Sequence, residues 1–435
     1  METISTRYND PDTLALNGGT SIRNGNWPTW PQYGSMALDL VRQVFDGGRW
    51  AVSGTWTGQC PLEQTFAEQF AEFLGVKYCI PTDHCSSALV MSMKSLGIGP
   101  GDEVIVPGLT WVACASTVLR VGAIPILVDI EPNTLCLSPE AVESAITTRT
   151  AAILVVHLYS AMANMDKLTA ISQKYSIPLI EDCAQAHGAR WSGQRAGSLG
   201  IIGVFSMQQG KALTCGEGGA AVTSDPRLFS LLEQLRNDGR RLAKTPRVVG
   251  HMHLEEVGEV IGANLAMSEF QLAVLLDGLN RLEEQNKTRA SRAIYLDKCL
   301  REISGLEFIR PHHQNDERAY YHYVVRYEPE SFAYKSVEAI CRALEAELGF
   351  WVHPAYRPLN DHPLYRPHLD KNLAHTFADL KSINPTRFEL PEASRQHKRS
   401  ILFHHSVLLG SLLDMDDIAT AFEKVQRLSS TLPDD

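Results

Sequence analysis

The chain has 435 residues, 44% of them hydrophobic, and a formal net charge of −10. This length is enough for two or three domains, and the composition is typical of a globular protein with a full core. The acidic balance disfavours nucleic acid and anionic lipid as the main partner. No apolar run reaches the ~18 residues that suggest a transmembrane helix, so the sequence predicts neither nucleic-acid nor membrane binding.

The N-terminal region is polar and resembles no signal peptide. It begins METISTRYNDPDT, without a basic segment followed by an apolar one. We expect residues 1–25 to form a loosely ordered arm. The WPTWP motif that follows, Trp27 to Pro31, predicts an extended segment, because closely spaced prolines exclude a helix. Nine scattered cysteines without a CxxC pair favour reduced thiols and a cytoplasmic location.

Helical and strand-like patterns alternate from about residue 60. Apolar side chains at helical spacing predict helices over 61–74, 88–96, 112–121 and 165–175, with a further helix starting at Ser138-Pro139. Short apolar runs predict strands over 78–81, 104–106, 125–129, 151–158, 178–181, 204–206 and 220–223. This alternation predicts an α/β fold, with a mostly parallel sheet covered by helices on both faces.

The last third of the chain predicts a smaller domain. Ser268 to Gln271 has the form of a capping box and opens a helix that can extend to about Leu300. Further predicted elements are strands over 321–327 and 400–404 and helices over 337–348 and 416–428. We therefore expect a large domain over 26–275 and a small α+β domain over 276–435.

Two candidate site features follow predicted strands, where parallel α/β sheets bind their ligands. The turn from Thr82 to Ser87 precedes a helix, and its backbone N–H groups and serines could bind a phosphate. An ordinary helix cap is the alternative. Asp182 follows a very apolar strand, so its carboxylate must be paired. A pyridinium nitrogen would be a suitable partner, and a structural salt bridge is the alternative.

Two further features complete the set. Lys211 lies between an apolar strand and the glycine-rich stretch Cys215 to Gly219, where the backbone can approach a ligand closely. A lysine in such a site can serve as a Schiff-base amine, although a solvated surface lysine is the alternative. Trp111 follows another strand and could stack on a flat heteroaromatic ring, or else belong to the core.

The order of phosphate turn, aromatic residue, aspartate and lysine is that of pyridoxal-phosphate (PLP) enzymes of the aspartate-aminotransferase type. The sequence resembles the DegT/StrS family of PLP-dependent sugar and aminocyclitol aminotransferases over nearly its whole length. The resemblance is carried by the segments GDEVIVPGLTWVA, VVHLYSAMANMD, IEDCAQAHGA, FSMQQGKALTCGEGG and NLAMSEFQLA. It implies PLP-dependent transferase fold type I, with a large sheet domain and a smaller C-terminal domain.

The resemblance also implies roles for individual residues. Lys211 would bond PLP as a Schiff base and later move the proton, and Asp182 would pair with the ring nitrogen. The other implied cofactor contacts are Gln185 at the phenolic oxygen, Trp111 on the ring, Ser86, Ser87 and Ser206 at the phosphate, and Asn264 reaching it from the other subunit of a homodimer. Two positions depart from the family pattern: Cys85 stands where glycine is usual, and Tyr159-Ser160 replaces an aromatic-glycine pair.

Within the family, WPTWP, SGTWTG, MQQGK and LFHHSVLL resemble the branch that aminates scyllo-inosose or 2-deoxy-scyllo-inosose. This implies transfer of an amino group from L-glutamine or glutamate to a cyclitol ketone in aminoglycoside or aminocyclitol biosynthesis. Candidate substrate contacts are Trp56, Arg195, Tyr356, His404 and His405. The alternatives are a nucleotide-sugar aminotransferase that uses glutamate and a non-catalytic PLP-binding regulator. No metal site is predicted, because the paired histidines lack the spacing of a zinc site.

Overall fold

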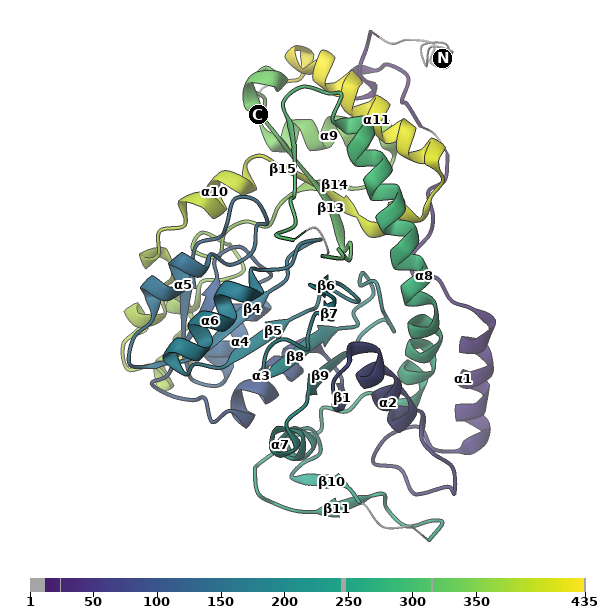
Figure 1. Ribbon diagram of the computed structural model, residues 1–435, viewed down its shortest axis with the longest axis vertical. Helices are drawn as coiled ribbons and strands as arrows, with labels where there is room; N and C mark the ends of the chain where they lie inside the picture. Colours follow the sequence, from purple (N-terminus) through teal and green to yellow (C-terminus); the bar gives the residue numbers. More distant parts are fainter. Residues whose placement is uncertain (1–11, 24, 244–247, 314–315, 434–435) are drawn as a thin grey trace.

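A seven-stranded sheet and a separate four-stranded sheet organise the chain (Figure 1). The computed structural model describes residues 12–23, 25–243, 248–313 and 316–433. A helix of 32 residues, α8 (Glu269–Leu300), extends along both parts of the molecule (Figure 1). Among the described residues, no helix is sufficiently long and apolar to cross a membrane.

The large sheet has the order β1-β9-β8-β5-β4-β2-β3. Its strands are β1 (Tyr78–Thr82), β2 (Glu103–Pro107), β3 (Ile124–Val128), β4 (Thr150–Val156), β5 (Leu179–Asp182), β8 (Ile202–Ser206) and β9 (Gly219–Thr223). The pairs β3–β2, β2–β4, β4–β5 and β5–β8 are parallel, whereas β9 runs antiparallel to both β8 and β1. The predicted mostly parallel sheet is therefore confirmed.

Helices pack on both faces of the large sheet, as predicted (Figure 1). They are α2 (Leu62–Leu74), α3 (Cys85–Ser95), α4 (Ala113–Arg120), α5 (Pro139–Ala145), α6 (Met165–Tyr175) and α7 (Pro226–Arg236). Because both faces are covered, every residue of β2, β5, β8 and β9 is buried. This explains why these strands read as continuous apolar runs instead of alternating ones.

The smaller sheet is antiparallel and has the order β12-β13-β15-β14. Its strands are β12 (Leu306–Phe308), β13 (His322–Tyr327), β14 (Val352–Pro354) and β15 (Ser400–His404). The helices α9 (Val337–Leu348) and α11 (Leu412–Arg427) bury their apolar residues with it, whereas α10 (Pro391–His397) contributes Ala393 to the core of the large sheet.

The helix α8 joins two hydrophobic cores. Its first half, to Leu282, belongs to the core around the large sheet, and its second half, from Ala293, belongs to the core around the small sheet. The predicted boundary at residue 275 therefore lies inside one continuous helix. A later segment also packs in the large core, through Leu359, Tyr365 and Leu390. No single position in the sequence therefore divides the residues of one core from those of the other.

The N-terminal segment is more ordered than the sequence predicts. Residues 1–11 and 24 lie outside the described part, but Leu14 and Ile22 are buried in the small core. The Glu347 carboxylate accepts hydrogen bonds from the backbone N–H groups of Ala15, at 2.8 Å, and Ile22, at 3.1 Å. A few apolar side chains and one buried carboxylate are thus enough to fix a polar segment.

Several short elements carry too little periodicity to be predicted. One is α1 (Ser35–Gly47), which buries only Ala37 and Val44 and packs along α8. The others are two small hairpins, one formed by β6 (Arg190–Trp191) and β7 (Gln194–Arg195), the other by β10 (Arg240–Leu242) and β11 (Leu254–Glu256). The WPTWP segment contains no helix, as predicted.

The capping box of α8 gives a first testable prediction. The Ser268 side chain accepts a hydrogen bond from the Gln271 N–H, and the Gln271 side chain accepts one from the Ser268 N–H at 2.8 Å. Replacing Ser268→Ala should destabilise the protein by about 1 kcal/mol, because a helix shared by both cores loses one cap. Thermal denaturation measures the loss. Ser291→Ala, on the exposed side of the same helix, is the matched control, and equal melting temperatures for the two variants would contradict the prediction.

Candidate active site

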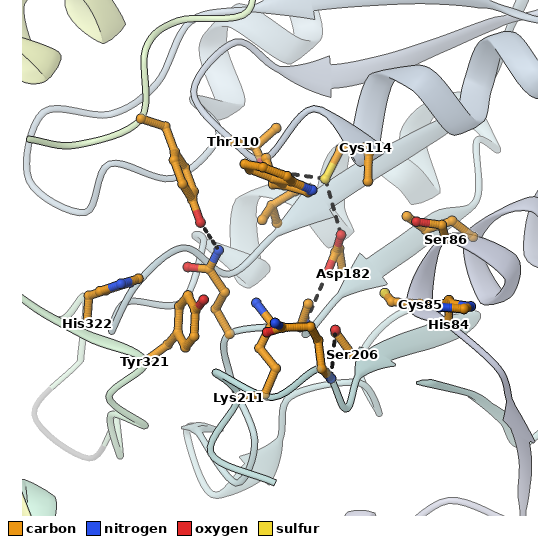
Figure 2. Close-up of a pocket in the computed structure, with 18 of the residues that line it drawn as sticks. His84, Cys85, Ser86, Thr110, Cys114, Asp182, Ser206, Lys211, Tyr321 and His322 are labelled. Carbon is orange, nitrogen blue, oxygen red and sulfur yellow. Dashed lines mark hydrogen bonds between the residues drawn. The ribbon is translucent and has the colours of Figure 1, made fainter. Parts of the chain in front are cut away.

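A cavity of about 440 Å³ opens at the carboxyl ends of the parallel strands (Figure 2). Thr110 and Trp111 line it after β2, Asp182 at the end of β5, and Ser206 at the end of β8. Tyr321 and His322 close it from the side of the small sheet. The strand ends therefore bring together residues that are separated by more than 200 positions in the sequence.

Asp182 is a buried carboxylate at the base of this cavity. One oxygen accepts a hydrogen bond from the Ala184 N–H at 3.0 Å, and the other accepts one from the Cys114 thiol at 3.2 Å. Burial raises the pKa of Asp182, and these two hydrogen bonds act in the opposite direction. Within the described residues it forms no salt bridge with a lysine, arginine or histidine. Such a carboxylate is suited to pair with a cationic group of a ligand.

Lys211 lies on the loop after β8 and lines the same cavity (Figure 2). Its side-chain nitrogen is 3.9 Å from the centre of the Tyr321 ring. In the part of the chain that the structure describes, no carboxylate forms a salt bridge with it, although its charge helps to lower the pKa of Asp182. The amine is therefore held near an aromatic face and remains available for chemistry.

Gln185 is held rigidly between two tyrosines. Its side-chain oxygen accepts a hydrogen bond from the Tyr159 N–H at 2.8 Å, and its side-chain nitrogen donates to the Tyr356 hydroxyl at 3.3 Å. Tyr159 itself has a positive φ of 59°, which is uncommon for a bulky residue. Its hydroxyl accepts a hydrogen bond from the Tyr356 N–H at 2.7 Å. These contacts offset the cost of the positive φ of Tyr159, a backbone conformation that glycine adopts more easily than tyrosine.

The start of α3 forms one corner of the cavity. Cys85 and Ser86 line it at the helix N-terminus, and Ser206 lies opposite (Figure 2). Strand β9 packs so closely here that a Cβ atom at Gly219 would lie 2.4 Å from the Cys85 nitrogen. Burial raises the pKa of the Cys85 thiol well above its ordinary value, so the thiol adds no negative charge. Backbone N–H groups and hydroxyls at a helix N-terminus suit an anion.

Comparison with known proteins identifies the family of this chain. The DegT/DnrJ/EryC1/StrS aminotransferase family matches residues 39–398. The chain belongs to this aminotransferase family. It is 46% identical to the L-glutamine:2-deoxy-scyllo-inosose aminotransferase of Streptoalloteichus tenebrarius, over 96% of this chain and 98% of that one. It is 47% identical to the L-glutamine:scyllo-inosose aminotransferase of Streptomyces griseus, over 95% and 97%.

A solved structure agrees with this assignment. The fold is similar to that of 3-amino-5-hydroxybenzoic acid synthase, with a TM-score of 0.78 and 28% identity over 92% of this chain and 99% of that one. The predicted α/β aminotransferase fold is thus confirmed, and so is the resemblance to the family. The aminotransferase has a large sheet that supplies Lys211 and Asp182 and a smaller sheet that closes the cavity.

Most of the predicted cofactor contacts line the aminotransferase cavity. They are Lys211, Asp182, Gln185, Trp111, Cys85, Ser86 and Ser206, together with the predicted substrate contact Tyr356. Ser87 does not line it, because its side chain is buried inside α3. Asn264 lies outside the cavity of its own chain and is exposed, with its backbone bridged to Asn237.

Four predicted substrate contacts lie outside this cavity. Arg195 forms a 2.6 Å salt bridge with Glu283 and packs on Phe73, which makes it a structural residue of the large domain. Trp56 packs beside His253 at the wall of a different cavity. His404 and His405 both contact the backbone carbonyl of Gly210. A sequence pattern carries no information on the direction of these four side chains.

Sequence reasoning missed several lining residues. From the small-domain side they are Tyr321, His322, Trp351 and His353; from the large domain they are His84, Thr110, Cys114, Gln208 and Glu217. Thr110 and Cys114 flank the predicted Trp111, so the segment itself was a usable signal. The small-domain residues had no such signal, because only the packing of the two sheets brings them to Lys211.

One cluster of possible metal ligands lies among the described residues, namely His157, Glu181 and Cys183. Both oxygens of Glu181 are already occupied by hydrogen bonds from the N–H groups of Gly197, Leu199 and Gly200. The His157 ring adds a further contact to Glu181 at 3.0 Å. We interpret this cluster as a structural anchor for the loop before β8.

The ionisation of Asp182 gives a second prediction. Because burial raises its pKa, the protonated form fits the cofactor-free site better than the carboxylate does. Its ionisation therefore destabilises the cofactor-free protein progressively as the pH rises above the ordinary aspartate pKa. Asp182→Asn should raise the melting temperature of the cofactor-free protein, and the gain should grow as the pH rises from below the ordinary aspartate pKa through the raised pKa of Asp182. A gain that does not change with pH over this range, or a loss, would contradict this account.

Proposed function

We propose that this aminotransferase uses PLP to transfer an amino group from L-glutamine to a cyclitol ketone such as scyllo-inosose or 2-deoxy-scyllo-inosose. The observation that carries the proposal is the convergence of Lys211, Asp182 and Gln185 in one cavity. The names of the relatives with 46% and 47% identity over nearly the full chain support the choice of donor and acceptor. Such a reaction belongs to the biosynthesis of aminoglycosides and related aminocyclitols.

The residues of the cavity fit PLP at three points. The buried Asp182 carboxylate, without a salt bridge in the described structure, suits a protonated ring nitrogen. The Lys211 amine forms no salt bridge in the described structure and is available to bond an aldehyde. The helix N-terminus at Cys85 and Ser86, with Ser206 opposite, suits the phosphate. Trp111 would cover the ring, and Gln185 would approach its phenolic oxygen.

Bound PLP supplies an aldehyde and a ring that accepts electrons. The protein supplies the proton transfers and their control. The Nζ atom of Lys211 would take a proton from the α-carbon of the donor and return a proton to the acceptor carbon in the second half of the cycle. Asp182 would hold the ring nitrogen in its protonated form, which favours the uptake of electrons by the ring. Gln185, fixed by Tyr159 and Tyr356, would contact the ring without adding charge.

The acceptor is better explained by a free cyclitol than by a nucleotide sugar. A nucleotide diphosphate requires cationic partners, usually arginines. Lys211 is the one lysine or arginine among the described residues that line the cavity. The remaining wall combines aromatic rings with neutral donors and acceptors such as Gln208, His322 and Tyr356. These groups suit the hydroxyls of a polyol ring.

We further propose a cytoplasmic homodimer with shared active sites. Asn264 and Trp56 lie away from the cavity of their own chain, so a second subunit could receive them at its phosphate and substrate ends. Ile261, close to Asn264, is 93% exposed, as expected of a surface that another subunit covers. The nine free cysteines are consistent with a reducing compartment.

The role of Lys211 gives a third prediction. Borohydride should fix PLP covalently to wild-type protein, and the label should map to the Lys211 peptide. Lys211→Ala should take no label and should lose at least about 100-fold in turnover, because both the anchoring amine and the proton carrier are absent. Lys94→Ala, on the large-domain helix α3, is a control that should keep both properties. Labelling of Lys211→Ala with normal turnover would overturn the proposal.

The choice of substrate gives a fourth prediction. With L-glutamine, the enzyme should aminate scyllo-inosose or 2-deoxy-scyllo-inosose, and mass spectrometry of the product measures this directly. A nucleotide-linked keto sugar should not be turned over, because the described cavity offers no cationic cluster for its diphosphate. Turnover of the nucleotide sugar alone, with glutamate as donor, would favour the other branch of the family. A cofactor spectrum that responds to no amino donor would indicate a binding protein without turnover.

A further inference from the structure

Two adjacent histidines hold the backbone immediately before Lys211. The His404 Nε2 atom lies 2.8 Å from the Gly210 carbonyl oxygen, and the His405 Nε2 atom lies 3.1 Å from the same oxygen. The histidines come from the end of β15 in the small sheet, whereas Gly210 belongs to the loop after β8 in the large one. One carbonyl therefore accepts two side-chain donors from the other part of the molecule.

Local hydrogen bonds fix which nitrogen of each ring carries the proton. The His404 Nδ1 atom accepts from the Ser406 N–H at 3.3 Å, and the His405 Nδ1 atom accepts from the Arg289 Nε–H at 3.1 Å. Each Nδ1 is thus an acceptor, so the N–H must be at Nε2 and must point to Gly210. Burial lowers the pKa of both rings, which keeps them neutral in this arrangement.

Arg289 supports His405 from behind and has an unusual environment. It is fully buried in α8, and within the described structure it forms no salt bridge with a carboxylate. Burial lowers its pKa to about 9. Its other hydrogen bond is to the Asn286 side chain at 3.0 Å. A buried arginine of this kind is costly and is therefore expected to have a specific task, here to orient His405.

Trp30, from the WPTWP motif, covers the arrangement. Its ring meets His405 edge to face with centroids 4.6 Å apart, and it lies 5.2 Å from the Arg289 guanidinium carbon. Its indole N–H donates to the Gln209 carbonyl at 3.1 Å. Two successive carbonyls before Lys211, those of residues 209 and 210, are thus bound by side chains. We call Trp30, Arg289, His404 and His405 the Gly210 clamp.

The clamp also reaches the other end of the lysine side chain. The backbone N–H of His405 donates to the Tyr321 carbonyl at 3.2 Å, and the centre of the Tyr321 ring lies 3.9 Å from the Lys211 Nζ atom. The same segment therefore fixes both the Gly210–Lys211 peptide and the Tyr321 ring that the lysine amine contacts.

Arg289 lies at the junction of the two cores. In the sequence of α8 it comes after Leu282, the last buried residue of the large core, and before Ala293, the first of the small core.

We propose that His404 and His405, oriented by Arg289 and covered by Trp30, are positioning residues that fix the Gly210–Lys211 peptide. The inference rests on the proposed function only in giving Lys211 its catalytic role. A lysine side chain has four rotatable bonds and has to move between the cofactor and the proton it transfers, while glycine leaves the preceding peptide free to rotate. The two donors on the Gly210 carbonyl remove that freedom together with the Lys211 N–H, which donates to the Gln208 carbonyl at 2.8 Å. A displacement of about 1 Å at such a site can slow a reaction about 100-fold.

The experiment compares His404→Leu/His405→Leu with His404→Gln/His405→Gln in the full chain. Glutamine can place an N–H close to the position of the histidine Nε2, whereas leucine cannot donate. His362→Leu, which removes a histidine hydrogen bond with the Leu364 N–H away from the cavity, is the control for general destabilisation. Hydrogen–deuterium exchange of the peptide that contains residues 208–211 reports on the clamp directly, and kcat and KM for glutamine report on its consequence.

We expect faster exchange of this peptide in the leucine pair, a kcat lower by about 10- to 100-fold and a KM for glutamine within about threefold of wild type. The glutamine pair should recover most of both losses, and His362→Leu should show neither. Wild-type exchange and kcat in a folded leucine pair would overturn the proposal. If the leucine pair does not fold, equal exchange and kcat for the single variants His404→Leu and His404→Gln would overturn it instead.

Failure of the clamp can be distinguished from failure of the proposed function. If the wild-type protein binds PLP on Lys211 but aminates no cyclitol ketone, the substrate assignment is wrong, while the exchange comparison still decides the clamp. If the enzyme aminates the cyclitol and the leucine variants exchange normally, the substrate assignment holds and the clamp is wrong.

Discussion

The arrangement of the active site depends on one buried carboxylate. Asp182 ends the central strand β5 and forms no salt bridge in the described structure, and two neutral donors compensate only part of its desolvation. An unpaired buried charge is tolerated only when the surrounding fold is stable enough to hold it. The sheet, covered on both faces, provides that stability. A cationic group that pairs with Asp182 would favour the charged form of this carboxyl, which burial alone disfavours.

The cavity also depends on the junction between the two hydrophobic cores. The cavity lies where the ends of the large sheet meet the small sheet, and α8 passes from one core to the other beside it. A helix of 32 residues is stiff enough to keep the two parts in register. Lys211 belongs to the large domain. The Gly210 carbonyl that precedes it is bound by His404, and its side-chain amine lies against the Tyr321 ring, so both contacts come from the side of the small sheet. The position of Lys211 thus depends on the packing of both cores.

The departures from the family pattern have local explanations. Cys85 occupies a position where glycine is usual, and the close approach of backbone there is achieved by Gly219 on the opposing strand. Ser160 stands where the family has glycine, and the positive φ of the preceding Tyr159 is offset by hydrogen bonds with Gln185 and Tyr356. Cys85 lines the cavity, and Tyr159 supports Gln185 in its wall.

The sequence by itself determined the α/β class and the mostly parallel sheet, and it singled out Lys211 and Asp182, which the structure brings to one cavity. Apolar periodicity and strand-end chemistry are local, so they can be read from short segments. Only the tertiary structure decided that His404 and His405 turn to Gly210, that Arg195 serves a salt bridge, and that Tyr321 and His322 line the cavity. The direction of a side chain and the packing of one sheet against another depend on contacts between residues distant in sequence. A short sequence pattern carries no information on such contacts.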